Sequence, residues 1–245
     1  MTGLLPLASF DAAIIDLDGT MVDTLSDFVV ATNLMLRDIG YDEVDRAVVA
    51  RLVGKGSEHL VDSVLKHAVA QRNIGLLAPE RIANIGPALA HYQQHYRNIN
   101  GQYALVYPGV SDGLHALQAA GIKLACLTNK PVAFARELLR LKGLDGFFSR
   151  VFGGDSFERK KPDPLPVLQT CKALGSSPAQ TLMVGDSSND AQAALAAGCP
   201  VVLVTYGYNH GLPVADAGAD AMIGSFVDLA PLLKLNNYKK TSLAQ

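Results

Sequence analysis

The chain has 245 residues, 49% of them hydrophobic and 18% charged, so it can bury a large core or a core domain with a smaller one. Its 21 Lys and Arg residues against 23 Asp and Glu residues give a net charge of -2 without a basic stripe, which argues against nucleic acid as a partner. No run approaches the roughly 18 apolar residues that span a bilayer, and the opening residues lack a basic flank, so we expect a cytoplasmic protein without a membrane partner.

Six short apolar runs predict strands, and each run stops at a polar or glycine cluster. These runs are found at residues 12–18, 122–129, 150–154, 181–187, 200–207 and 221–225. Continuous apolar runs of this length suit strands buried on both faces of a parallel sheet. Helices are predicted between the later strands, because Pro131 opens one and Gly175 and Gly198 close two others. The alternation predicts an α/β fold, a Rossmann-like doubly wound parallel sheet.

The first two strands are separated by about 105 residues, whereas a crossover between parallel strands needs only a dozen or more. This interval predicts an inserted helical cap domain at 23–106 that can hinge over the core. The core domain would then comprise residues 1–22 and 107–234. A polar segment without periodicity, 235–245, is expected to be a frayed tail.

Within the cap, the first helix is expected to begin with a capping box formed by Thr24 and Asp27. Residues from Leu25 to Leu36 recur at helical spacing in this first helix, and further helical stretches are expected around 44–53, 57–71 and 79–98.

Polar residues follow several of the predicted strands, and ligands bind outside the carboxyl ends of strands in open α/β sheets. These residues are Asp16, Asp18, Gly19, Thr20, Thr128, Asn129, Asp186 and Asp190. Carboxylates that lie close together raise one another's pKa unless a cation is bound among them, and hard oxygen ligands favour Mg²⁺. A single Asp at a strand end more often caps a helix or starts a turn. Two acids in DLDGT and a third strand ending in GDSSND weaken that interpretation and predict a magnesium site.

Four motifs appear in the order found in one enzyme family: DLDGT at 16–20, Thr128 in LACLTN, Lys161 in KKPDP, and GDSSND at 185–190. With these motifs the chain resembles the haloacid dehalogenase superfamily, and within it the phosphatases that carry a helical cap after the first strand. The motifs extend over almost the whole predicted core, which makes the combination far more specific than any one of them.

The resemblance implies a role for each motif residue. Asp16 is expected to be the nucleophile that forms an aspartyl phosphate, and Asp18 the general acid for the leaving alcohol and then the base for water. Thr128 and the backbone amide of Asn129 are expected to bind phosphate oxygens, while Lys161 balances the charge of the phosphate and Asp16. Dehalogenating relatives do not keep an Asp at position 18, so Asp18 favours phosphotransfer.

By the same resemblance, Mg²⁺ is expected to bind the carboxylates of Asp16 and Asp186 and the backbone carbonyl of Asp18, with Asp190 binding directly or through water. Gly19 and Thr20 are expected at the phosphate site, where Gly19 lets the backbone turn closely past the phosphate.

Substrate choice is expected to come from the cap, because the core holds only the phosphate. Gly54 and Gly56 predict a tight turn that brings Lys55 over the crevice, or else an ordinary interhelical turn with a solvated lysine. The segment TYGYNHG at 205–211 resembles one in phosphoglycolate phosphatases and either lines the crevice or packs against the core. The YPGV segment at 107–110 resembles the return linker of the same enzymes and is interpreted as a hinge.

Other conspicuous residues receive structural interpretations. His91 and His95 have the spacing of a metal-binding pair on a helix, but no Glu or Cys nearby completes a site, so a surface or packing role is expected. Lys160 is expected to be exposed to solvent. The three cysteines are widely spaced in apolar segments and are expected to be buried thiols.

The overall expectation is a magnesium-dependent phosphatase for a small phosphate monoester, above all 2-phosphoglycolate, working as a monomer or homodimer. A sugar phosphate phosphatase, including one for an amino sugar 6-phosphate, and a β-phosphoglucomutase-like phosphomutase share the same core motifs. A phosphonate hydrolase would use Lys55 in a Schiff base. A catalytically silent phosphate-binding module would be expected to have lost an acid or the lysine, and neither is lost here.

Overall fold

The central feature of the molecule is a parallel sheet of six strands in the order β5-β4-β1-β6-β7-β8. The strands are β1 (Ala12–Ile15), β4 (Lys123–Leu127), β5 (Arg150–Phe152), β6 (Thr181–Gly185), β7 (Val201–Val204) and β8 (Ala221–Ile223). This computed structural model describes residues 10–71 and 85–233. All six predicted runs form strands, so the prediction of a doubly wound α/β fold is confirmed. The strand order reverses beside β1, the point where such sheets bind their ligands.

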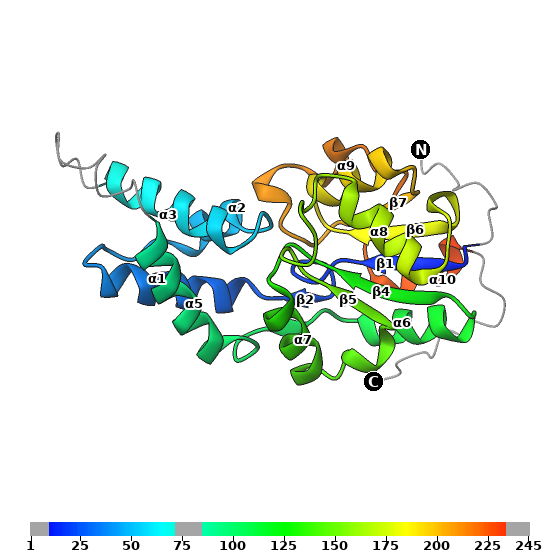
Figure 1. The fold of residues 1–245 in the computed structure, drawn as a ribbon, viewed down its shortest axis with the longest axis horizontal. Coiled ribbons are helices and arrows are strands. Elements are labelled where there is room, and N and C mark those ends of the chain that lie inside the picture. The colour runs from blue at the N-terminus through cyan, green and yellow to red at the C-terminus, as the bar shows by residue number, and fades with distance from the viewer. Residues whose placement is uncertain (1–9, 72–84, 234–245) are drawn as a thin grey trace.

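Two sets of helices cover the two faces of the sheet (Figure 1). One face packs against α6 (Val110–Ala119), α7 (Val132–Leu141) and α10 (Leu229–Leu232), and the other against α8 (Leu165–Leu174) and α9 (Ser188–Ala197). Short 3-10 helices complete the core at Asp145–Phe147, Pro178–Gln180, Asn209–Gly211, Val214–Ala217 and Phe226–Asp228.

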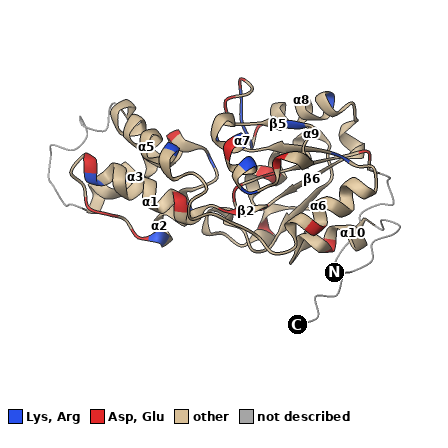
Figure 2. Ribbon diagram, turned by 90° about the horizontal axis from the view of Figure 1, so that it is seen from below, with Lys and Arg blue, Asp and Glu red and all other residues tan. Residues whose placement is uncertain are grey.

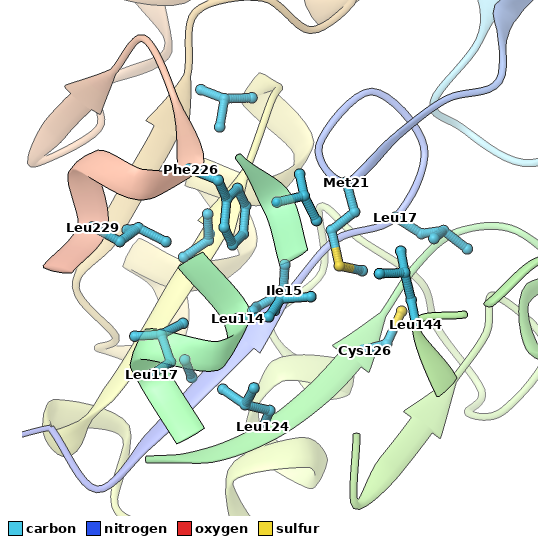
Figure 3. Close-up of a cluster of buried hydrophobic side chains, with 14 of the residues drawn as sticks. Ile15, Leu17, Met21, Leu114, Leu117, Leu124, Cys126, Leu144, Phe226 and Leu229 are labelled. Carbon is cyan, nitrogen blue, oxygen red and sulfur yellow. The ribbon is translucent and has the colours of Figure 1, made fainter. Parts of the chain in front are cut away.

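Alternate residues of each strand point to opposite faces, so the apolar runs fill both layers. Ile15 and Cys126 join the cluster under α6, in which Leu114, Leu117 and Phe226 are also buried (Figure 3). Their sequence neighbours in β1 and β4 pack under α8 and α9. Each fully buried aliphatic side chain stabilises the fold by about 1.5–3 kcal/mol, which fixes the carboxyl edge of the sheet as a rigid platform.

The cap forms a second lobe with its own apolar cluster (Figure 1). It contains α1 (Leu25–Asp38), α2 (Arg46–Leu52), α3 (Ser57–Gln71) and α5 (Gly86–Ile99). Two short antiparallel strands, β2 (Val22–Asp23) and β3 (Leu105–Val106), join the chain segments that lead into and out of this lobe. The start of the helix expected at 79–98, the opening residues and the predicted tail lie outside the described residues. None of the described helices combines the length and apolar character needed to cross a membrane.

The predicted capping box at the start of α1 is wrong. Thr24 precedes the helix, but its buried hydroxyl has no hydrogen-bond partner among the residues that the structure describes. Asp27 instead accepts hydrogen bonds from the backbone amides of Gly101 (2.6 Å) and Tyr103 (2.8 Å), next to the outgoing linker. The backbone amide of Thr24 donates to the hydroxyl of Tyr208, 2.8 Å away in the core. Hydrogen bonds between residues far apart in the sequence therefore take the place of the local cap. They connect the start of α1 to the core and to the segment that leads out of the cap.

The three cysteines are buried free thiols, as predicted, and the sulfur atoms of Cys171 and Cys199 lie 3.7 Å apart.

Candidate active site

A cavity lies where the carboxyl ends of β1, β4 and β6 face the cap, and acidic and basic segments meet in this region between the lobes (Figure 2). Its volume is about 40 Å³. The core contributes polar lining residues: Asp16, Asp18, Thr128, Asn129, Lys130, Lys161, Asp186 and Asp190. The cap contributes apolar and aromatic side chains, among them Phe28, Leu60, Tyr92 and Tyr96. The sequence-predicted acids therefore come together under an apolar lid.

Three buried carboxylates surround one ammonium group at the floor of the cavity. One oxygen each from Asp16, Asp186 and Asp190 lies within 4.8 Å of the others. The Nζ atom of Lys161 donates to Asp16 Oδ1 (2.8 Å), to Asp190 Oδ1 (2.6 Å) and to the carbonyl of Leu127 (2.8 Å). Residues far apart in the sequence, such as Asp16 and Lys161 at a separation of 145 positions, thus form one charged cluster.

The cluster has three carboxyl groups but one ammonium group, so its negative charges are not fully neutralised. Burial raises the pKa of Asp16 to about 7, against the opposing effect of Lys161. Burial and the neighbouring charges of Asp190 and Asp16 raise the pKa of Asp186 well above its usual range. The pKa of Lys161 is raised by Asp16 and Asp190, although burial acts in the opposite direction. Three buried carboxylates with one ammonium are a hard-oxygen donor set with excess negative charge, so the residues present suit a divalent cation such as Mg²⁺.

Local backbone geometry positions the acids. Gly19 has φ +83°, and a Cβ at this position would lie 2.3 Å from Asp186 Oδ2, so only glycine permits the turn after Asp18. Asp190 uses its second oxygen, Oδ2, to accept a hydrogen bond from the Ser187 hydroxyl (2.8 Å) at the start of α9. Both oxygens of Asp190 are therefore already engaged by protein groups.

Of the core residues expected around the phosphate, Thr128 and Asn129 lie on the cavity, whereas Gly19 and Thr20 are not among its lining residues. Thr128 and Asn129 line it, and the Asn129 side chain donates to the carbonyls of Gly54 (3.0 Å) and Lys161 (2.8 Å). Thr20 is fully buried outside the lining residues, and its hydroxyl has no partner. Packing under the turn directs this side chain into the core.

The cap turn presents its backbone rather than its lysine to the cavity. Gly54 and Gly56 line the cavity with φ +102° and +90°, and the Gly54 carbonyl also accepts a hydrogen bond from the Asn189 side chain (3.1 Å). Lys55 lies instead in a neighbouring open depression that Lys160 also lines. Because the two glycines and the bonded carbonyl fix the turn, the side chain between them points out of the cavity.

The segment 205–211 contributes Tyr208, Asn209 and His210 to the cavity wall. The amide of Tyr208 donates to Asp186 Oδ2 (2.7 Å), and Asn209 accepts a hydrogen bond from the amide of Ser188 (2.9 Å). Burial, followed by the charge of Lys55, lowers the pKa of His210. This segment therefore holds the metal-type ligand Asp186 and the start of α9 in place.

The sequence pattern gives no indication of Lys130, which is one of the most closely bound groups in the cavity. Its Nζ atom donates to Asp18 Oδ1 (2.9 Å) and Oδ2 (3.1 Å) and to the hydroxyl of Tyr96 (2.7 Å). The same atom lies 4.5 Å from the centre of the Phe28 ring. Only its place directly after Thr128 and Asn129 at a strand end could have indicated it.

His91 and His95 lie on the cap surface, away from this cavity. Both rings contact Asp38 Oδ2, at 3.0 Å and 2.6 Å. Within residues 10–71 and 85–233, the carboxylate cluster of the cavity is the sole close grouping of three metal-type ligands.

Comparisons with known proteins agree with this geometry. The family model described as "Haloacid dehalogenase-like hydrolase" matches residues 13–204. A phosphoglycolate phosphatase from Thiobacillus denitrificans is 39% identical over 89% of this chain and 93% of its own length. A plasmid-encoded phosphoglycolate phosphatase from Cupriavidus necator is 44% identical over 91% of this chain and 92% of its own. The crystal structure of a predicted phosphoglycolate phosphatase from Haemophilus somnus superposes with a TM-score of 0.85 at 33% identity, covering 91% of this chain and 97% of that chain.

Proposed function

The chain belongs to the haloacid dehalogenase-like hydrolases, and from this membership we propose that it is a magnesium-dependent phosphatase that hydrolyses 2-phosphoglycolate through an aspartyl phosphate. The observation that carries the proposal is the buried Asp16 carboxylate, 2.8 Å from the Lys161 ammonium, with Asp18 two residues further along the same strand end. Relatives with this name at 39% and 44% identity support the choice of substrate.

In the first step, the Asp16 carboxylate attacks phosphorus and the bond to the ester oxygen breaks. Asp18 donates its proton to that oxygen, so that glycolate leaves as the alcohol. In the second step, ionised Asp18 takes a proton from water, the water oxygen attacks phosphorus, and the bond between phosphorus and the Asp16 oxygen breaks. Inorganic phosphate is released, and both Asp16 and Asp18 return to their starting forms.

Two further polar groups of the cavity serve the phosphate. The Lys161 ammonium neutralises charge on Asp16 and on the transferring phosphoryl group, and the Thr128 hydroxyl donates to a phosphate oxygen. Electrostatic complementarity of this kind, in a site shielded from water, accounts for most of the rate enhancement in phosphoryl transfer.

Magnesium would be held by the carboxylates of Asp16 and Asp186 and the backbone carbonyl of Asp18. When bound, it supplies positive charge beside the phosphate oxygens. Asp190 is assigned a supporting role, because its oxygens already bind Lys161 and Ser187. We assign no role at the cavity to Lys55, and Gly19 acts by allowing the close turn against Asp186.

The size of the cavity favours a small ester over the sugar phosphates that related enzymes could process. A volume of about 40 Å³ corresponds to about three water molecules by the same measure, so the cap must open for either ligand, and a hexose phosphate, the larger of the two, requires the wider opening. We further propose that the enzyme is cytoplasmic and acts as a monomer or homodimer on a freely diffusing small molecule. The near-neutral charge of the chain supports a partner other than nucleic acid.

The test is release of inorganic phosphate from 2-phosphoglycolate with Mg²⁺, in a panel with hexose phosphates, an amino sugar 6-phosphate and nucleotides. Asp16→Asn should abolish release, whereas Asp112→Asn, an exposed acid on α6, should leave it unchanged. Equal turnover by Asp16→Asn would refute the mechanism. Isomerised sugar phosphate appearing faster than free phosphate would show a phosphomutase instead.

A further inference from the structure

One polar group in the cavity has no hydrogen-bond partner within residues 10–71 and 85–233. Tyr92 on α5 is only 1% exposed and lines the cavity, yet its hydroxyl makes no hydrogen bond. Leaving a buried hydroxyl unpaired is costly, and such groups in native proteins usually meet a ligand or water. Burial raises the pKa of Tyr92 well above its ordinary value, so the hydroxyl keeps its proton and can donate it in a hydrogen bond. Its ring stacks on Tyr96 with 5.6 Å between the centroids, which fixes its direction.

The same end of the cavity holds a buried cation. Lys130 is 2% exposed in its side chain, and its ammonium bonds to Tyr96 as well as to Asp18. Among the side chains described as lining the cavity, the other basic groups are Lys161, bound to the acids of the floor, and His210, whose pKa is lowered by burial. Lys130 is therefore the cation at the cap side of the cavity.

We propose that the Lys130 ammonium and the Tyr92 hydroxyl form a subsite for the carboxylate of the substrate. The inference rests on the proposed function, because it takes Asp16 and Lys161 as the phosphate end of the cavity. Asp18 meets the ester oxygen, and the Lys130 Nζ atom lies 2.9 Å from its carboxylate. A group attached one carbon after the ester oxygen therefore reaches Lys130, and this is where 2-phosphoglycolate carries its carboxylate.

The subsite selects phosphate esters of short α-hydroxy acids. A carboxylate receives a charge-assisted bond from the ammonium and a second bond from the phenol. Phe28, whose ring lies next to the Lys130 ammonium, is apolar and cannot hydrogen-bond to sugar hydroxyls. When the ammonium turns to the substrate, its bonds to Asp18 weaken, and both oxygens of Asp18 become free for proton transfer. Lys130 is thus a specificity residue that also releases the general acid once the correct substrate is bound.

The experiment measures binding without turnover. In 3-phosphonopropionate a methylene replaces the ester oxygen of 2-phosphoglycolate, and 3-phosphonopropanamide has the same shape without the carboxylate charge. The Kd of each is measured by calorimetry with Mg²⁺ for the full-length wild type, Tyr92→Phe, Lys130→Met and Tyr103→Phe. Tyr103 is 52% exposed and is the matched control.

We expect wild type to bind the carboxylate at least about tenfold more tightly than the amide. Tyr92→Phe, which keeps the stacked ring, should reduce this preference about threefold, and Lys130→Met should remove it. Tyr103→Phe should retain it. A purely structural role for Tyr92 or Lys130 would weaken both ligands equally and leave the ratio of the two Kd values unchanged.

An unchanged ratio in Tyr92→Phe, or no preference in the wild type, would overturn the subsite. If Lys130→Met does not fold, Tyr92→Phe alone decides. The proposed function is judged separately by hydrolysis of 2-phosphoglycolate. Hydrolysis with an unchanged ratio refutes the subsite only, whereas a shifted ratio without hydrolysis upholds the subsite and refutes the phosphatase.

Discussion

Asp18→Asn keeps the size of the side chain but removes the proton that the leaving oxygen requires. Asp18 is 11% exposed, and Lys130, its ion-pair partner, is 2% exposed, so bulk water has little access to replace the lost acid. General acid–base catalysis contributes about 10²- to 10⁴-fold, and turnover of 2-phosphoglycolate should fall by that factor.

The same variant separates the two chemical steps. With 4-nitrophenyl phosphate the leaving phenolate is stable without a proton, so formation of the aspartyl phosphate should remain fast. Hydrolysis of that intermediate still needs a base, so we expect a burst of about one nitrophenolate per active site followed by a slow phase. Stopped-flow absorbance measures both phases. The wild type should show no such accumulation, and Asp112→Asn serves as the control.

Two results would contradict this account. Equal loss of the first-step rate with both substrates would remove Asp18 from protonation of the leaving group. Full steady-state turnover of 4-nitrophenyl phosphate would remove it as the base in the second step. Urea unfolding checks the fold, because Asn retains one acceptor for Lys130 and we expect a stability loss of only about 1–3 kcal/mol.

Three further outcomes follow from the same contacts. Mg²⁺ at 100 times its Kd should stabilise the wild type by about 2.7 kcal/mol in thermal unfolding, and Asp186→Asn should lose most of that gain; an equal shift would place the metal elsewhere. Tyr208→Phe removes the acceptor of the Thr24 amide and should cost about 1–2 kcal/mol in urea unfolding, whereas no change would mean that water replaces it. Asp27→Ala leaves the amides of Gly101 and Tyr103 unpaired, so we expect a loss of about 2–5 kcal/mol, and a loss below 1 kcal/mol would contradict a structural role.

Features encoded in short stretches of the chain were predictable. The apolar runs predicted the six strands because strands buried on both faces need continuous apolar sequence. Asp16 and Asp186 end two of these strands, and parallel strands bring their carboxyl ends to one edge, so their proximity followed from the pattern. The local sequence also predicted a close backbone turn at Gly19. The reason why no other residue fits there, the proximity of Asp186, depends on the tertiary structure.

Features that depend on distant partners required the tertiary structure. The spacing of Thr24 and Asp27 suits a capping box, but Asp27 accepts hydrogen bonds from the backbone amides of Gly101 and Tyr103, some 75 residues away, instead. Lys130 meets Asp18 across 112 residues and Tyr96 across 34, and no local pattern encodes either contact. The sequence thus determined the sheet and its acidic edge, whereas the docking of the cap decided which side chains close the cavity, because that choice depends on how two separately packed lobes meet.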